Sequence, residues 1–126
     1  MEVSWCAAHS LGKLNDKRAV EPLIDALSTN VDHYTRQEAA RSLGKLSDVR
    51  ALHPLLDALT DADKYVRREA ASALGDLGDE RALPALLVVE RNDHVTTNQA
   101  GRQGVREMAA KAIERIKAHK HEGHRE

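Results

Sequence analysis

The sequence predicts an all-α protein, an α-α superhelix that coils as a right-handed solenoid of about seven helices stacked as antiparallel pairs. The chain repeats itself, because Ala-Ala pairs begin at residues 7, 39, 70 and 109. Each copy divides into two segments whose apolar residues recur every three or four positions, the spacing of one helix face. Only 2% of the residues are aromatic, so the core has to be aliphatic. Stacking such pairs builds a continuous core that no single pair can form.

The first kind of helix is clearest in 64–77, KYVRREAASALGDL. Val66, Ala70 and Leu74 fall on one face, and neighbouring alanines allow another helix to approach closely. The second kind is clearest in 50–59, RALHPLLDAL, whose leucines also share one face. The chain therefore alternates two kinds of helix, beginning with the first kind over about 3–14.

Recurring polar and small residues mark the connections between these helices. An aspartate precedes each helix of the second kind, where a carboxylate accepts from free N–H groups; these are Asp16, Asp48 and Asp79. A proline follows near the first turn, where its missing N–H matters least. A glycine recurs inside each helix of the first kind and predicts close contact between helix backbones; these are Gly12, Gly44 and Gly75.

One repeat domain is expected over residues 1–118, followed by a flexible His-rich tail at 119–126. The predicted units are about 3–14, 18–46, 50–76 and 81–118. The segment 92–104 is longer than its equivalents and polar. It is either a tolerated surface insertion or a functional loop.

The repeated letters resemble the HEAT-like repeat of the phycobilisome-lyase (E-Z type) family over about residues 3–117. The matching residues are Val66-Arg67, Ala70-Ala71, Leu74-Gly75, Asp79, Arg81-Ala82-Leu83 and the Pro54-Leu55 pair. In the usual order of this family, the Pro-Leu helix is the outer A helix and the Val-Arg helix is the inner B helix. The resemblance implies the fold but no single function, since such repeats occur in bilin lyases, in a di-iron hydroxylase and in binding scaffolds.

The resemblance to the hydroxylases implies His-Glu pairs on the B helices that bind two irons. At those positions this sequence has no histidine, and carboxylates without imidazoles make a poor iron site; the aligned pairs are Trp5-Cys6, Gln37-Glu38, Arg68-Glu69 and Glu107-Met108. No catalytic residue, metal or cofactor is predicted. We therefore expect a chain that is not an enzyme.

The predicted function is a non-catalytic protein-protein interaction scaffold or adaptor, which binds another protein on the concave face formed by the B helices. The expected partner-binding residues are Trp5, His9, Arg36, Gln37, Arg41, Lys45, Arg67, Arg68, Ser72, Glu107 and Lys111. Alternatively, Arg36 and Arg67 pair with acidic residues of the preceding turns and join one repeat to the next; the candidates are Asp32 and Asp61 or Asp63.

Two further functions stay open. One is an accessory bilin lyase-like protein that handles a chromophore, although aromatic residues to sandwich a tetrapyrrole are scarce. The other is weak nucleic-acid binding through the Arg/Lys ladders. The formal net charge of −1 and the low aromatic content disfavour nucleic acid.

The first B helix lacks an A partner, so Trp5 is either a lid over the first layer or a contact for a partner, including a second copy of the chain in a homodimer.

Cys6 is the only cysteine, so no disulfide forms within the chain. No apolar run approaches the ~20 residues of a membrane span. The cytoplasm is the expected location.

Overall fold

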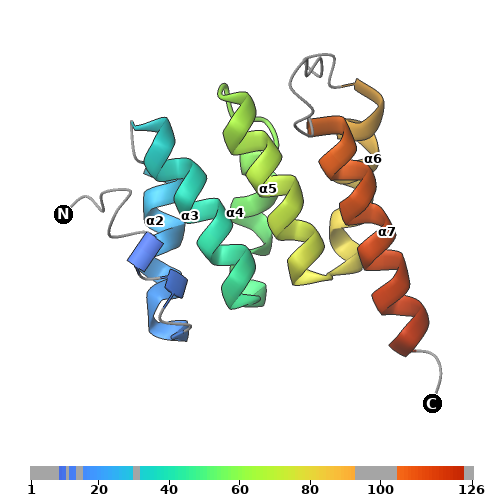
Figure 1. The fold of residues 1–126 in the computed structure, drawn as a ribbon, viewed down its shortest axis with the longest axis horizontal. Coiled ribbons are helices and arrows are strands. Elements are labelled where there is room, and N and C mark those ends of the chain that lie inside the picture. Colours follow the sequence, from blue (N-terminus) through green and yellow to red (C-terminus); the bar gives the residue numbers. More distant parts are fainter. Residues whose placement is uncertain (1–8, 11, 14–15, 30–31, 93–104, 124–126) are drawn as a thin grey trace.

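The computed structural model describes residues 9–10, 12–13, 16–29, 32–92 and 105–123, and the regular structure in these ranges is helical (Figure 1). Short 3-10 turns at Lys17–Ala19, Val49–Ala51 and Glu80–Ala82 lead into the A helices. The helices are α2 (Val20–Thr29), α3 (His33–Leu46), α4 (Leu52–Ala58), α5 (Lys64–Leu77), α6 (Leu83–Asn92) and α7 (Val105–Gly123). Residues 9–10 and 12–13 are helical as well.

The helices form two layers of a solenoid. The B helices α3, α5 and α7 pack side by side, α3 on α5 and α5 on α7 (Figure 1). The A helices form the second layer, where α2 packs on α3, α4 on α5 and α6 on α7. This arrangement of helix pairs confirms the fold class that the repeated sequence predicts.

The core between the layers is aliphatic. The largest side chains with less than 2% exposure include Leu23, Leu43, Leu52, Leu55, Leu74, Leu86 and Ile116. The repeated alanines lie between them, with Ala39, Ala40, Ala70, Ala71 and Ala109 at 0% exposure. These small side chains let the B helices pack closely, so the core needs no aromatic ring.

The recurring glycines lie where one B helix meets the next. A Cβ atom added to Gly44 would lie 2.8 Å from the Cα of Ala73, and one added to Gly75 would lie 3.0 Å from the Cα of Ala112. Both neighbours are backbone atoms that cannot move aside without displacing a helix. The close backbone approach predicted from the glycines is confirmed.

The recurring aspartates cap the turns that lead into the A helices, as expected. The Asp48 carboxylate accepts from the Arg50 N–H at 2.9 Å and from the Arg50 Nε at 3.1 Å. Asp16 and Asp79 repeat this arrangement with the arginines that follow them. The guanidinium and backbone N–H of Arg50 together lower the pKa of Asp48 from 3.8 to about 2.

This capping makes part of the stability depend on acid. The pKa of Asp48 is depressed in the folded chain. The ionised Asp48 carboxylate therefore stabilises the fold fully above the unfolded pKa of about 3.9, and this stabilisation is lost as the pH falls toward 2. We expect Asp48→Asn, which keeps the capping oxygen, to reduce the change in unfolding free energy between pH 4 and pH 2. Urea unfolding across that interval measures it, and Asp57→Asn on α4 is the control. An unchanged pH dependence would contradict the role of the Asp48 charge.

At its C-terminal end α7 continues to Gly123, beyond the predicted boundary at residue 118. Lysine and glutamate have good helix propensity, so the polar sequence permits this extension. Residues 93–104, which contain most of the predicted insertion, lie outside the described residues.

No helix within the described ranges combines the length and apolar composition needed to cross a bilayer.

Candidate functional site

The B helices carry a stripe of polar and aromatic side chains, which we call the B-helix face and which ranges from exposed to buried. Its members come from three adjacent helices and differ between repeats. They are Tyr34, Gln37, Glu38, Arg41 and Lys45 of α3, Tyr65, Arg68, Glu69 and Ser72 of α5, and Glu107 and Lys111 of α7.

An ion-pair ladder crosses this face from one B helix to the next. His9 Nδ1 lies 3.1 Å from one carboxylate oxygen of Glu38, and the other oxygen of Glu38 accepts from Arg41 at 3.0 Å. Arg41 reaches the next helix and donates to both oxygens of Glu69 at 3.1 and 3.3 Å. Arg68 completes the ladder 3.7 Å from Glu69. The ladder therefore joins three consecutive B helices.

The charges of the ladder are arranged by depth. The side chains of Glu38 and Glu69 are 13% and 11% exposed, whereas that of Arg41 is 43% exposed. The hydrogen bond to Glu69 is the main cause that raises the pKa of Arg41, so this guanidinium stays charged. The carboxylates of the ladder are thus neutralised below the surface, and Arg41 is the most exposed charge of the ladder.

This ladder does not fit the iron site that the resemblance to the hydroxylases implies. Glu38 and Glu69, the two carboxylates at the expected ligand positions, are already held by Arg41. Among the residues that the structure describes, no group of three His, Cys, Asp or Glu side chains is placed to hold a metal ion. A guanidinium lies between the carboxylates where a metal would have to bind.

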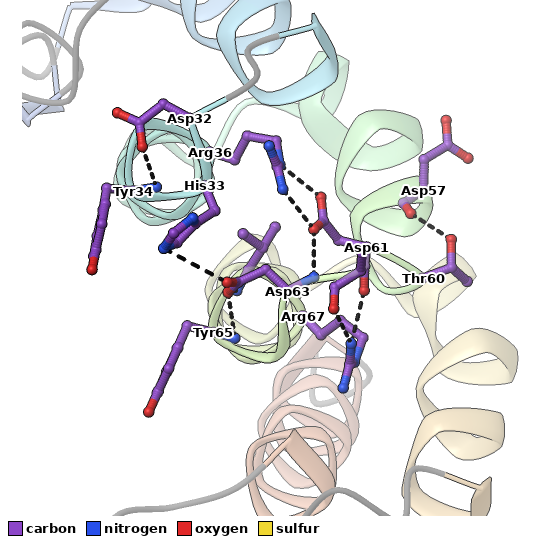
Figure 2. A network of polar contacts seen from close by, with 12 residues as sticks. Asp32, His33, Tyr34, Arg36, Asp57, Thr60, Asp61, Asp63, Tyr65 and Arg67 are labelled. Carbon is purple, nitrogen blue, oxygen red and sulfur yellow. Dashed lines mark hydrogen bonds and ion pairs between the residues drawn. The ribbon is translucent and has the colours of Figure 1, made fainter.

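A second polar network joins the repeats at the turn before α5 (Figure 2). Arg36 donates to both oxygens of Asp61 at 2.9 and 3.1 Å, and both side chains are more than four-fifths buried. Asp61 also accepts from the Asp63 N–H at 2.8 Å. Arg67 donates to the carbonyl oxygens of Asp61 and Ala62 at 2.8 and 3.2 Å. Arg36 thus joins α3 to the turn of the following repeat, whereas Arg67 bonds to the turn that precedes its own helix.

The other predicted partner-binding residues have varied surroundings. Lys45, Glu107 and Lys111 are exposed, and Gln37, Arg68 and Ser72 are half-buried. Trp5 lies outside the described residues, so its two interpretations stay predictions. The partner-binding role of the set as a whole also stays a prediction.

The sequence interpretation missed two tyrosines of this face. Tyr34 and Tyr65 occupy equivalent positions at the starts of α3 and α5, and Tyr34 is 61% exposed. Lys64 and Arg68 lie over the Tyr65 ring, 5.2 and 5.3 Å from its centre. Tyr34 and Tyr65 are separated in the sequence by the same interval as the Ala-Ala pairs at 39 and 70. This shared interval was the signal that could have revealed the two tyrosines.

Two solved structures resemble this chain. The complex of CpcE and CpcF of phycocyanin lyase from Nostoc sp. PCC7120 shares 31% sequence identity at a TM-score of 0.78, over 92% of this chain and 48% of that chain. Human deoxyhypusine hydroxylase in complex with glycerol shares 27% identity at a TM-score of 0.75, over 94% of this chain and 38% of that chain. This chain thus spans less than half the length of either. No curated protein sequence matches it.

These similarities correct one prediction. The sequence interpretation expected a chain that is not an enzyme, but the similar structures are a phycocyanin lyase complex and a hydroxylase. The chain is therefore related to families of enzymes. The absence of recognised catalytic motifs misled the interpretation, because a repeat fold can carry chemistry without a linear motif.

The family models agree with the observed helix pairs. The model described as PBS lyase HEAT-like repeat matches residues 7–29, which include the first described B-helix residues and α2. The model described as HEAT repeats matches residues 20–103, more than half of the chain. This chain belongs to the HEAT repeat family.

Proposed function

We propose that this chain is an accessory bilin lyase-like protein that handles a chromophore on its B-helix face and works with a second protein. The observation that carries this proposal is the 31% identity to the phycocyanin lyase complex over 92% of the chain. The match of a PBS lyase HEAT-like repeat at residues 7–29 supports it independently.

The chemistry of the B-helix face is compatible with such a ligand. A bilin carries carboxylates on a flat, largely apolar ring system, so it favours cations next to accessible apolar surface. Arg41, Lys45 and Lys111 are exposed cations on this face, and the neighbouring carboxylates of Glu38 and Glu69 are held below it. We therefore expect charge rather than an aromatic sandwich to supply most of the attraction.

A spectroscopic titration tests chromophore handling. We expect biliverdin, titrated with the chain at low salt, to show a saturable change in its visible absorption spectrum. Lys45→Glu with Lys111→Glu should weaken this binding about tenfold, because two exposed attractions become repulsions. Arg91→Glu on α6 is a single charge reversal away from the face and should leave binding unchanged. An absorption spectrum that does not respond to the chain would rule out chromophore handling.

A second candidate function is a scaffold that binds a protein segment on the same face. The similar complex contains two different lyase proteins, CpcE and CpcF, which favours a protein partner for this chain as well. A homodimer around Trp5 stays a prediction, since that residue lies outside the described ranges. Nucleic-acid binding is less favoured, because Glu38 and Glu69 neutralise cations of the ladder.

A further inference from the structure

Arg41 is the residue that connects the ion-pair ladder. Its guanidinium donates to one oxygen of Glu38 at 3.0 Å and to both oxygens of Glu69 at 3.1 and 3.3 Å. The Arg41 side chain is far more exposed than either carboxylate. A ligand that approaches the B-helix face therefore meets the Arg41 guanidinium before it meets Glu38 or Glu69.

Each carboxylate of the ladder has a second neighbour besides Arg41. His9 Nδ1 lies 3.1 Å from the Glu38 oxygen that Arg41 does not use. The Arg68 guanidinium lies 3.7 Å from Glu69, so a shift of under ~1 Å brings the two within hydrogen-bond distance. A buried carboxylate that loses its partner is normally costly, because its charge is left unpaired. Arg41 can leave the ladder at a smaller cost, since His9 and Arg68 remain.

The row of residues that contains Arg41 continues across the B-helix face. Ser72 directly follows the Ala-Ala pair of α5, as Arg41 follows that of α3 and Lys111 that of α7. Because α5 packs between α3 and α7, this row places a short hydroxyl side chain between two longer cationic ones. A ligand carboxylate above Ser72 can therefore be reached from α3 by Arg41 and from α7 by Lys111.

We propose that Arg41 is a ligand-binding residue that the ladder holds occupied until an anionic ligand arrives. A carboxylate of the ligand replaces Glu69 on the Arg41 guanidinium, and Glu69 passes to Arg68. Competition from Glu69 lowers the affinity for the ligand, as in any site whose binding-competent form is only partly populated. This proposal rests on the chromophore-handling part of the proposed function, in which a bilin supplies the carboxylate.

Absorption titrations of the full chain with biliverdin at low salt test the competition. Glu69→Gln keeps the shape of the side chain and removes its charge. We expect it to strengthen biliverdin binding about fivefold, because Arg41 loses its competitor. When Arg41 is already replaced by glutamine, the same Glu69→Gln change should alter binding by less than about twofold, since no guanidinium is left to release. Glu114→Gln, at an exposed carboxylate of α7 outside the ladder, is the matched control and should leave binding unchanged.

Arg68→Gln tests the transfer of Glu69 without altering a buried carboxylate. Without Arg68, a displaced Glu69 would stay buried with no cation beside it, so biliverdin binding should weaken about threefold. The effect of Arg68→Gln should disappear when residue 69 is glutamine, because an amide needs no cation. If Arg68 contacted the ligand directly, its replacement would weaken binding equally in both backgrounds. That result would contradict the transfer.

The titrations separate failure of this proposal from failure of chromophore handling. Equal affinities of the unaltered chain and Glu69→Gln would overturn the proposed competition and leave chromophore handling supported. The same holds if Glu69→Gln strengthens binding equally with and without Arg41, because the gain would then be a general effect of charge. A biliverdin spectrum that responds to neither protein would overturn both. Circular dichroism confirms that each variant is folded.

Discussion

Replacing Gly44 with valine is expected to lower the free energy of unfolding by about 3 kcal/mol, the upper end for overpacking a close contact. The added Cβ would lie 2.8 Å from the Cα and 2.9 Å from the Cβ of Ala73 on the facing helix. Neither atom can rotate away, so α3 and α5 have to separate. Valine adds two further methyl groups to the same contact. For a domain of ordinary stability this is a large fraction of the total.

Urea unfolding followed by circular dichroism measures this change. The adjacent Lys45→Val places the same β-branched residue on the same helix, at an exposed position, and should change stability by less than about 0.5 kcal/mol. Gly44→Ala should have an intermediate effect, because alanine gains about 1 kcal/mol of helix propensity over glycine. Equal stabilities of Gly44→Val and Lys45→Val would show that the B helices do not approach as the structure describes.

Removing Arg36 is expected to lower the free energy of unfolding by about 2 kcal/mol, since a largely buried carboxylate loses its partner. Arg36 and Asp61 are 18% and 14% exposed, so solvent screens the lost charge only in part. The two residues belong to consecutive repeats, and their hydrogen bonds tie α3 to the turn before α5. The loss should therefore weaken the contact between repeats rather than a single helix.

A double-mutant cycle isolates this interaction. Arg36→Ala, Asp61→Ala and the double variant should give a coupling energy of about 1 kcal/mol or more, since the pair is bidentate. Arg91→Ala on α6 serves as an exposed arginine control. A coupling energy near zero would mean that Arg36 and Asp61 do not act as a pair in solution.

The fold was predictable because its determinants recur in the sequence. Apolar periodicity located the helices, and the recurring aspartates and glycines marked the caps and the close helix contacts that the structure confirms. The end of α7 was less predictable, because residues 119–123 are polar and lack an apolar face. Helix propensity alone does not fix where such a helix ends.

The site was harder to predict because its ion pairs join side chains of different repeats, and the sequence does not show which of these side chains lie close together in the fold. Glu69 was considered as an iron ligand, and only the structure shows Arg41 reaching it from the preceding helix. Arg36 was expected to bind its own preceding turn or a partner, and its pairing with Asp61 in the following turn is visible only in the structure. Tyr34 and Tyr65 were missed because the partner-binding residues were sought at positions that differ between repeats. These two tyrosines occupy the same position in consecutive repeats.

The most direct test of the central claim, that the B-helix face and not the A-helix layer binds the ligand, is an NMR titration of the ¹⁵N-labelled chain with biliverdin. We expect the perturbed backbone amides to lie along the exposed stripes of α3, α5 and α7, near residues such as Arg41, Lys45 and Lys111. Perturbations concentrated on α2, α4 and α6, or none at saturating biliverdin, would contradict it.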